Sequence, residues 1–357
     1  MAVCGGTNNS KQQHNETGNK YSPYMRKQCW LAALFIFHLA GAGAQSVKDS
    51  VPAPIAGGVV TLSVCNNRLT PDQRAEMVTQ TLLGTPVQIL RKDKGYYQVR
   101  TPDGYVSYTE MSGVQLLDTT ALKAWLHADK IVYTAGYGYV LDAPNKHGAQ
   151  VSDLVAGDIL RVLRKKRRYY QVQFPDNRTG YVPVKETMPY TQWVARKNPD
   201  AAAILATAQR FTGVPYLWGG TSVKGVDCSG FTKSCYYLNG IVLPRDASQQ
   251  ALVGEPVDIT EHDTISNSKC LRNLQAGDLL FFAVKKGTPQ QHVIHTAIYM
   301  GGGRFIQAAG MVRVNSIVPG APDFDAREYE RLVSARRMLT AIGTNAVTRV
   351  EAHPYYQ

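Results

Sequence analysis

Cys228 is the residue of this sequence whose surroundings best suit covalent chemistry. It lies in GVDCSGF, residues 225–231, after a Gly-rich stretch and at the start of a segment that reads as a helix over residues 228–238. Free N–H groups and the positive dipole end at a helix start favour an anion, so we expect a lowered thiol pKa and a reactive thiolate. From the residues alone, the thiol could instead be a metal ligand, half of a disulfide or a buried side chain.

The other cysteines after residue 44 are better explained as structural residues than as nucleophiles. Cys65, Cys235 and Cys270 show no paired spacing typical of a zinc site, and so few cysteines do not make a disulfide scaffold. Cys235 lies two turns along the same helix and is expected to fill the core. Cys270 falls in a polar stretch and is either free or bridged, so one disulfide stays open. The sequence therefore predicts no metal site and no cofactor.

A cysteine nucleophile needs a base, and His295 is the histidine whose context suits that role. It begins HTAIYMGGGRFIQAAG, which reads as two apolar strands around a Gly-rich hairpin turn. Folding this hairpin brings His295 nearly opposite Gln307. A Gln can accept from a ring N–H and fix the tautomer, but it carries no charge. Taken alone, a strand histidine is more often a packed or surface residue.

The elements that must position these residues lie in the second half of the chain. Asn198 as N-cap and Pro199 at the first helical position predict a helix to about Phe211. Strand-like runs start at Gly277, His292 and Arg304. Helices followed by strands predict an α+β fold, and the segment 253–273 reads as a polar surface loop.

The first half contains an internal repeat. Residues 82–111 and 154–187 each have an apolar strand, a basic turn, a second strand YYQV and a third strand GYV. This pattern predicts meandering antiparallel sheet, and each unit is small enough to be a barrel or half-barrel. Most tyrosines and basic residues here are expected to serve strand packing and solvated turns, and a minority to touch a ligand.

Composition and the N-terminus point to export. The chain has 357 residues and a formal net charge of +12. Residues 25–46 have a basic start, an apolar centre and a small-residue end, as in a signal peptide cleaved after Ala44, and translation could begin at Met25. The positive charge could serve an anionic envelope polymer, or only solubility. Nucleic acid is a poorer partner for an exported protein, and no membrane span is expected after cleavage.

The motifs YLWGG, DCSGF, LPRD, GDLLFF and HTAIYMG resemble, in combination, the NlpC-type cell-wall cysteine peptidases. The repeat resembles bacterial SH3-like domains. The resemblance implies an α+β architecture in which a papain-like domain, with helices packed on an antiparallel sheet, follows two SH3-like barrels. The expected boundaries are a signal peptide at 1–44, barrels at 45–120 and 121–192, the peptidase at 193–345 and a tail at 346–357.

The resemblance also implies catalytic roles. Cys228 would be the nucleophile, His295 the general base and Gln307 the third member, at a position where His is commonest in the family. Tyr216 matches a tyrosine whose hydroxyl helps the Cys228 N–H stabilise the oxyanion, although it could equally be a buried structural aromatic.

Further positions match residues that bind substrate in the family's SH3-bearing subgroup, the γ-D-glutamyl-L-diamino acid endopeptidases. These are Trp218, Asp227 and Ser229, with Glu76 and Tyr108 as the expected contacts from the first barrel. Asp227 could read a cationic substrate amine, cap the helix, or do both. In LPRD, Arg245 and Asp246 either bind substrate carboxylates or brace the loop.

The expected substrates are peptidoglycan-derived peptides with a free N-terminal L-Ala, cleaved after γ-D-Glu in the periplasm, envelope or medium. Two other functions stay open. The protein could act on intact wall polymer or as an amidase, or it could be a non-catalytic envelope-binding protein.

Overall fold

The computed structural model describes residues 52–195, 198–344 and 346–357. The expected signal peptide and its cleavage site lie outside the described residues. None of the helices within these ranges is long and apolar enough to cross a membrane.

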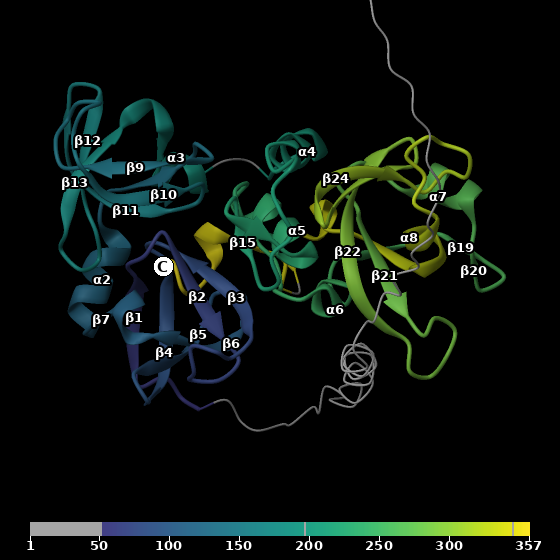
Figure 1. Ribbon diagram of the computed structural model, residues 1–357, viewed down its shortest axis with the longest axis horizontal. Coiled ribbons are helices and arrows are strands. Elements are labelled where there is room, and N and C mark those ends of the chain that lie inside the picture. The colour runs from purple at the N-terminus through teal and green to yellow at the C-terminus, as the bar shows by residue number, and fades with distance from the viewer. Residues whose placement is uncertain (1–51, 196–197, 345) are drawn as a thin grey trace, which may run out of the picture. The chain divides into compact units, whose positions relative to one another are not determined.

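Two seven-stranded sheets occupy the first half of the described chain. The first has the strand order β3-β2-β6-β5-β4-β1-β7 and the second β10-β9-β13-β12-β11-β8-β14, so the second copies the first strand for strand (Figure 1). The first sheet comprises β1 (Ala56–Val60), β2 (Val64–Arg68), β3 (Met77–Leu82), β4 (Pro86–Asp93), β5 (Tyr96–Arg100), β6 (Val106–Glu110) and β7 (Val114–Leu117). The second comprises β8 (Lys130–Tyr133), β9 (Tyr137–Leu141), β10 (Gln150–Val155), β11 (Ile159–Lys166), β12 (Tyr169–Gln173), β13 (Thr179–Pro183) and β14 (Thr187–Pro189).

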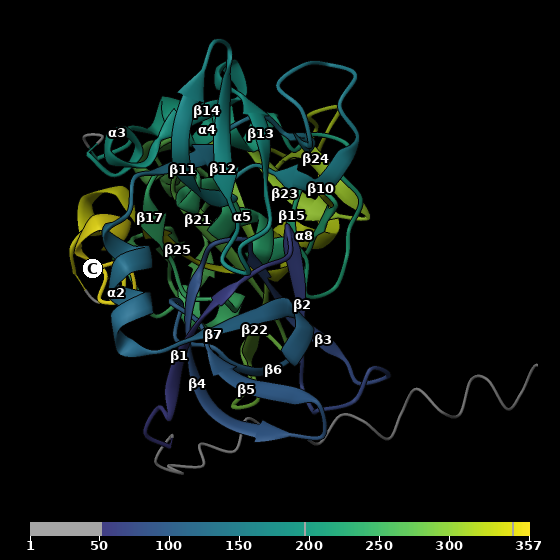
Figure 2. The ribbon, with the colours of Figure 1, turned by 90° about the vertical axis from the view of Figure 1, so that its left-hand side faces the viewer.

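The repeated YYQV forms β5 and β12, each hydrogen-bonded between two antiparallel neighbours (Figure 2). Val99 and Val172 point into the two barrel cores, which explains why this apolar position recurs. The helix α2 (Thr119–His127) joins the barrels, and Asp118 caps it by accepting from the Ala121 N–H. The barrels touch where Leu83 enters the core of the second one.

The peptidase half is built on a six-stranded sheet with the order β18-β25-β21-β22-β23-β24. Its strands are β18 (Glu255–Val257), β21 (Leu279–Val284), β22 (His292–Gly301), β23 (Arg304–Ala309), β24 (Met311–Ser316) and β25 (Leu332–Arg337). Short two-stranded pairs join β15 (Thr221–Ser222) to β16 (Gly225–Val226), β17 (Ile241–Val242) to β26 (Thr348–Arg349), and β19 (Thr260–Glu261) to β20 (Thr264–Ile265). The helices are α3 (Tyr190–Val194), α4 (Ala201–Gln209), α5 (Cys228–Tyr237), α6 (Ala247–Gln250), α7 (Asn267–Asn273) and α8 (Ala326–Arg331).

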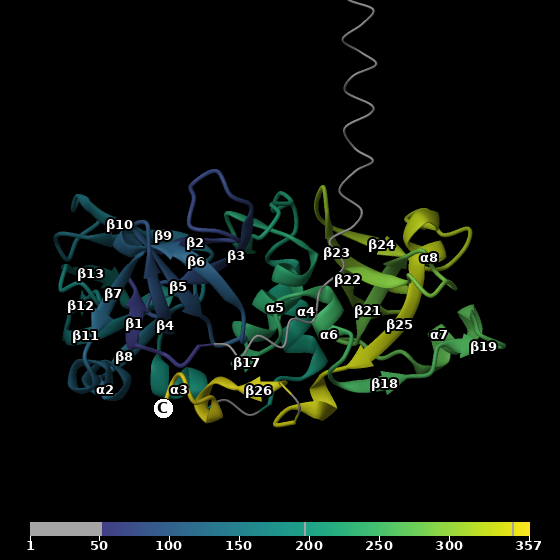
Figure 3. The same ribbon diagram turned by 90° about the horizontal axis from the view of Figure 1, so that it is seen from below.

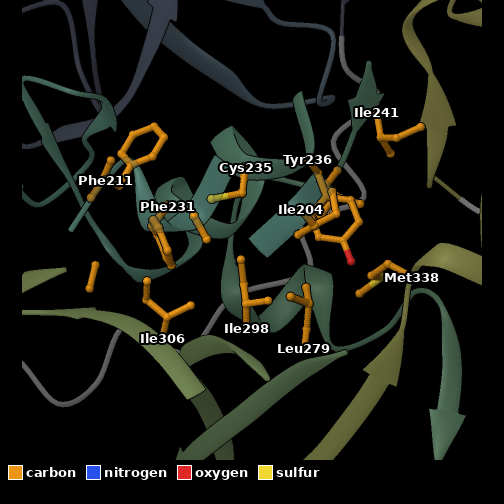
Figure 4. Packing of buried hydrophobic residues seen from close by; sticks show 14 of the residues in the cluster. Ile204, Phe211, Phe231, Cys235, Tyr236, Ile241, Leu279, Ile298, Ile306 and Met338 are labelled. Carbon is orange, nitrogen blue, oxygen red and sulfur yellow. The ribbon is translucent and has the colours of Figure 1, made fainter. Parts of the chain in front are cut away.

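The core of this half lies between α5 and the sheet. α5 packs on α4 and on β22 and β23 (Figure 3). Phe231 and Cys235 on α5 meet Ile298 and Ile306 of the sheet (Figure 4). Cys235 is fully buried there, as expected for core filler. The α+β, papain-like fold predicted from the sequence is thus the one observed.

Two local expectations need correction, and the open question of a disulfide is answered. α4 begins at Ala201 and is capped by Asp200, whose side chain accepts from the Ala203 N–H, so Asn198 is not the cap. The segment expected as a polar loop contains α7, and its Cys270 is buried in the core. Its thiol is free, as are those of Cys65, Cys228 and Cys235, so none of these four is bridged.

The C-terminal segment is not a loose tail. β26 pairs with β17, and Val350 and Tyr356 are buried in one cluster with Val132 of the second barrel and Trp193 of α3. The C-terminal segment therefore packs between the second barrel and the peptidase half and joins them.

Candidate active site

Cys228 is the first residue of α5, beside the backbone of β22. Asp227 is the N-cap of α5, and its carboxylate accepts from the Gly230 N–H at 2.6 Å. Gly230 has no room for a side chain, because a Cβ there would lie 2.0 Å from the Gly220 carbonyl oxygen. The Cys228 thiol faces the Ile294 carbonyl oxygen at 3.9 Å, one residue before His295. The DCSG motif thus brings a tight loop, a capped helix and the histidine strand together.

The Cys228 thiol is protonated in the resting site. Burial raises its pKa to about 12, the neighbouring Asp227 carboxylate adds to this, and the N–H groups of Thr296 and Ser229 only partly offset both. The thiolate predicted from the helix dipole is therefore wrong for the resting protein. Burial outweighs the dipole, whose end Asp227 already occupies.

His295 is buried on β22 and hydrogen-bonded to Gln307 on β23. Its Nε2 lies 2.6 Å from the Gln307 Oε1. The strand pairing matches Ile298 with Ile306, so Gln307 lies diagonally across from His295 rather than directly opposite. Burial lowers the pKa of His295 to about 4, so the imidazole is neutral near pH 7.

The Gln307 amide is held in one orientation by two further residues. Its Nε2 donates to Asn315 Oδ1 at 2.9 Å and to Asp325 Oδ2 at 3.2 Å. A carboxylate only accepts, so the amide nitrogen must face Asp325 and the amide oxygen must face His295. His295 then carries its proton on Nε2, which leaves Nδ1 as the basic nitrogen. Asn315 and Asp325 were missed in the sequence because nothing in their spacing ties them to β23.

A cleft of about 270 Å³ opens at Cys228. The predicted residues Tyr216, Trp218, Asp227, Ser229 and Glu76 all line it. Glu76, from the segment before β3, accepts from Trp218 Nε1 at 2.6 Å, so the first barrel reaches the cleft as expected.

The contact predicted for Tyr108 needs correction. Tyr108 lies on β6 with its ring buried under the Arg91 guanidinium, 5.4 Å from the ring centroid, and it does not line the cleft. Tyr105 lines it instead, from the turn that precedes β6. Both tyrosines sit in GYVSYTEM, and strand alternation decides which faces the cleft.

The Asp227 carboxylate is occupied by hydrogen bonds and an ion pair that hold the fold together. It also accepts from the Gly219 N–H at 2.9 Å and forms a buried ion pair with Arg245, at 2.6 Å. Arg245 further donates to Ser229 Oγ and to Thr79 Oγ1 of the first barrel. Arg245 is therefore a brace, and Asp227 caps α5 while facing the cleft.

Two other carboxylates give the cleft its charge. Glu76 and Asp246 line it without a cation among the lining residues. Burial raises the pKa of Asp246, and the Tyr105 hydroxyl hydrogen-bonds to its carboxylate. Burial, with the neighbouring Asp227 carboxylate, raises the pKa of Tyr216, so its hydroxyl stays a donor beside the thiol.

Within residues 52–195, 198–344 and 346–357 there is no group of three or more His, Cys, Asp or Glu residues arranged to hold an ion.

A papain-like α+β domain with Cys228 at the start of α5, beside the strand on which His295 is hydrogen-bonded to Gln307, is typical of cysteine peptidases. Residues 213–323 match the NlpC/P60 family, and residues 68–114 match the bacterial dipeptidyl-peptidase SH3 domain. Residues 213–323 thus form an NlpC/P60 cysteine peptidase domain, with an SH3 domain at residues 68–114 before it. Only the first barrel has a family match; the second shares its strand order.

Several known proteins resemble the chain along most of its length. It is 27% identical over 346 residues to the gamma-D-glutamyl-L-lysine dipeptidyl-peptidase of Bacillus cereus, covering 87% of this chain and 98% of that one. The protein of the same name in Bacillus subtilis is 29% identical, over 68% of this chain and 77% of that one. The crystal structure of an NlpC/P60 family protein from Bacillus cereus superposes with a TM-score of 0.66 at 22% identity, over 80% of this chain and all of that one.

Proposed function

We propose that the protein hydrolyses the bond between γ-linked D-Glu and the diamino acid of peptidoglycan stem peptides that begin with a free L-Ala. The observation that carries this proposal is the acidic cleft at Cys228, reached by Glu76 of the first barrel. Relatives named gamma-D-glutamyl-L-lysine dipeptidyl-peptidase support the bond type.

The substrate's N-terminal ammonium would be bound by Glu76 and Asp246. An ammonium is attracted by carboxylates, and Asp227 is already neutralised by its ion pair with Arg245. The sequence suggested that Asp227 recognises the substrate amine. We assign this recognition to Glu76 and Asp246 instead. A peptide whose N-terminus is acetylated or linked to glycan would lack the positive charge of the ammonium. Its additional group would be directed against the first barrel.

The reaction would start from a neutral Cys228–His295 pair. As Sγ attacks the carbonyl carbon of γ-D-Glu, His295 Nδ1 takes the thiol proton. The Cys228 N–H and the Tyr216 hydroxyl would stabilise the oxyanion. The imidazolium then protonates the leaving amine, and a water deprotonated by His295 hydrolyses the thioester to release L-Ala-γ-D-Glu.

The test compares L-Ala-γ-D-Glu-diaminopimelate with its N-acetylated form, with products followed by mass spectrometry. We expect cleavage of the free peptide only, and none by Cys228→Ala. Glu76→Gln and Asp246→Asn should each raise KM for the free peptide roughly tenfold. Glu110→Gln, a carboxylate of the first barrel outside the cleft, is the matched control. Equal cleavage of both peptides would disprove the amine-reading role.

Two other functions would show in the same assay. Release of peptides from intact wall polymer would favour a general wall hydrolase. No cleavage of any muropeptide by the folded protein would favour an envelope-binding protein.

We also propose that the protein is exported, on the strength of residues 25–46. N-terminal sequencing of the protein from its native cells should begin at Gln45. A cytoplasmic protein that starts at Met1 or Met25 would overturn this.

A further inference from the structure

A second cavity, of about 1070 Å³, lies on the second barrel, away from the proposed chemistry. It is formed by β9, the hairpin between β11 and β12, and the residues that follow β13. Five exposed basic residues line it: Lys146, Lys165, Arg167, Arg168 and Lys185. We call this the basic groove.

The charge of the basic groove is hardly compensated. The one carboxylate in its lining is Glu186, which accepts from Tyr133 and lies 3.9 Å from Lys185. The other four basic side chains form no ion pair with any residue that the structure describes. Several like charges around one hollow are unfavourable unless an anion joins them.

Three tyrosine rings form part of the wall. Tyr137 and Tyr139 on β9 pack edge to face, with ring centroids 5.4 Å apart, and Tyr169 on β12 also lines the groove. Tyr137 is 52% exposed, which is unusual for a large ring that serves only packing. Ring faces in a polar groove suit the flat, C–H-rich faces of sugars.

The first barrel is an internal control for these features. Lys92 pairs with Tyr97 as Lys165 pairs with Tyr170, and Lys94 and Arg167 both have positive φ angles, of 48° and 55°. Yet the hairpin reads KDKG at residues 92–95 and KKRR at residues 165–168.

The strand that carries Tyr137 and Tyr139 also differs in sequence from its counterpart in the first barrel. The pairing of Arg68 with Tyr108 and of Leu141 with Tyr181 aligns β2 with β9. Tyr137 and Tyr139 then stand where the first barrel has Val64 and Asn66. The shared fold therefore requires neither the four-residue basic run nor the exposed tyrosines.

We propose that the basic groove binds a glycan chain that carries carboxylates. The charges are spread along a hollow much larger than the active-site cleft, which fits a polymer better than a small anion. The tyrosines add contacts to sugar rings that a purely electrostatic site lacks. This site does not depend on the proposed peptidase specificity.

The test measures binding of a size-defined polygalacturonate to the purified protein by isothermal titration calorimetry. We expect binding that weakens as salt rises. Lys165→Gln with Arg167→Gln should weaken it about tenfold. The matched control, Lys92→Gln with Lys94→Gln, removes the same charge at the equivalent positions and should have little effect. Tyr137→Ala should also weaken binding, with peptidase activity on small peptides unchanged in all variants.

Three results would overturn the proposal. Equal losses in the two double variants would mean that net charge alone attracts the polymer. Equal competition by neutral dextran would remove the role of the carboxylates. Tighter binding of an oligothymidylate of the same charge would assign the groove to nucleic acid.

Discussion

At the scale of single residues, Gln307 orients His295 and is itself held in place. Its amide is fixed by Asn315 and Asp325, so its oxygen is always presented to His295. Asp325 supplies, one residue further away, the negative charge that the amide lacks. The charge of Asp325 raises the pKa of His295, although burial outweighs it.

Substitutions of Gln307 should therefore distinguish its role in orienting His295 from a contribution of charge. Gln307→Leu removes the tautomer lock and should lower kcat roughly 100-fold with little change in KM. Gln307→His, which can still accept from His295 and donate towards Asp325, should keep activity within a few-fold. Steady-state kinetics on the free tripeptide tests both, and a Gln307→His variant as inactive as Gln307→Leu would contradict this account.

The neutral resting pair predicts how the thiol responds to pH. Because the pKa of Cys228 is raised to about 12, the thiolate fraction grows as pH rises and stays small near neutrality. Inactivation by iodoacetamide should accelerate about tenfold per pH unit between pH 6 and 9. The Cys228→Ala variant reports any alkylation of the other thiols. A rate independent of pH over this range would indicate a preformed thiolate–imidazolium pair.

At the scale of elements, the start of α5 depends on the buried pair between Asp227 and Arg245. Arg245 is 1% exposed and joins the start of α5, through Asp227 and Ser229, to Thr79 of the first barrel. Removing one partner of such a pair leaves an uncompensated buried charge.

Arg245→Met should consequently destabilise the protein by about 3–5 kcal/mol, measured by urea unfolding. The double variant Arg245→Met with Asp227→Asn should recover part of this loss, because the orphaned charge is gone. If the double variant were as unstable as the sum of the two single variants, the ion pair would not be the cause.

Element boundaries also show what the sequence could predict. α5, β22 and β23 carry strong local signals, namely an N-cap, alternating apolar residues and a Gly-rich turn, and all three were predicted close to their observed bounds. The placement of Tyr105 beside Asp246 in the cleft was not predicted, because it depends on how the first barrel meets the peptidase half. No local pattern encodes that contact.

At the scale of the whole molecule, the C-terminal segment closes a cluster shared by the second barrel and the peptidase half. Val350 is fully buried in it, so Val350→Ala should lower the free energy of unfolding by about 1–3 kcal/mol. Exposed Gln357→Ala serves as the control. Thermal unfolding followed by circular dichroism measures both, and equal midpoints would contradict the role given to this segment.

The same segment also limits the order in which the parts of the molecule can fold. Synthesis runs from the N-terminus, so both barrels and all strands of the six-stranded sheet are made before β26, Val350 and Tyr356 exist to complete the cluster. Until then Trp193 and Val132 lack part of their apolar cover. A stop codon about ten residues early would thus spare every candidate catalytic residue and still leave that cluster incomplete.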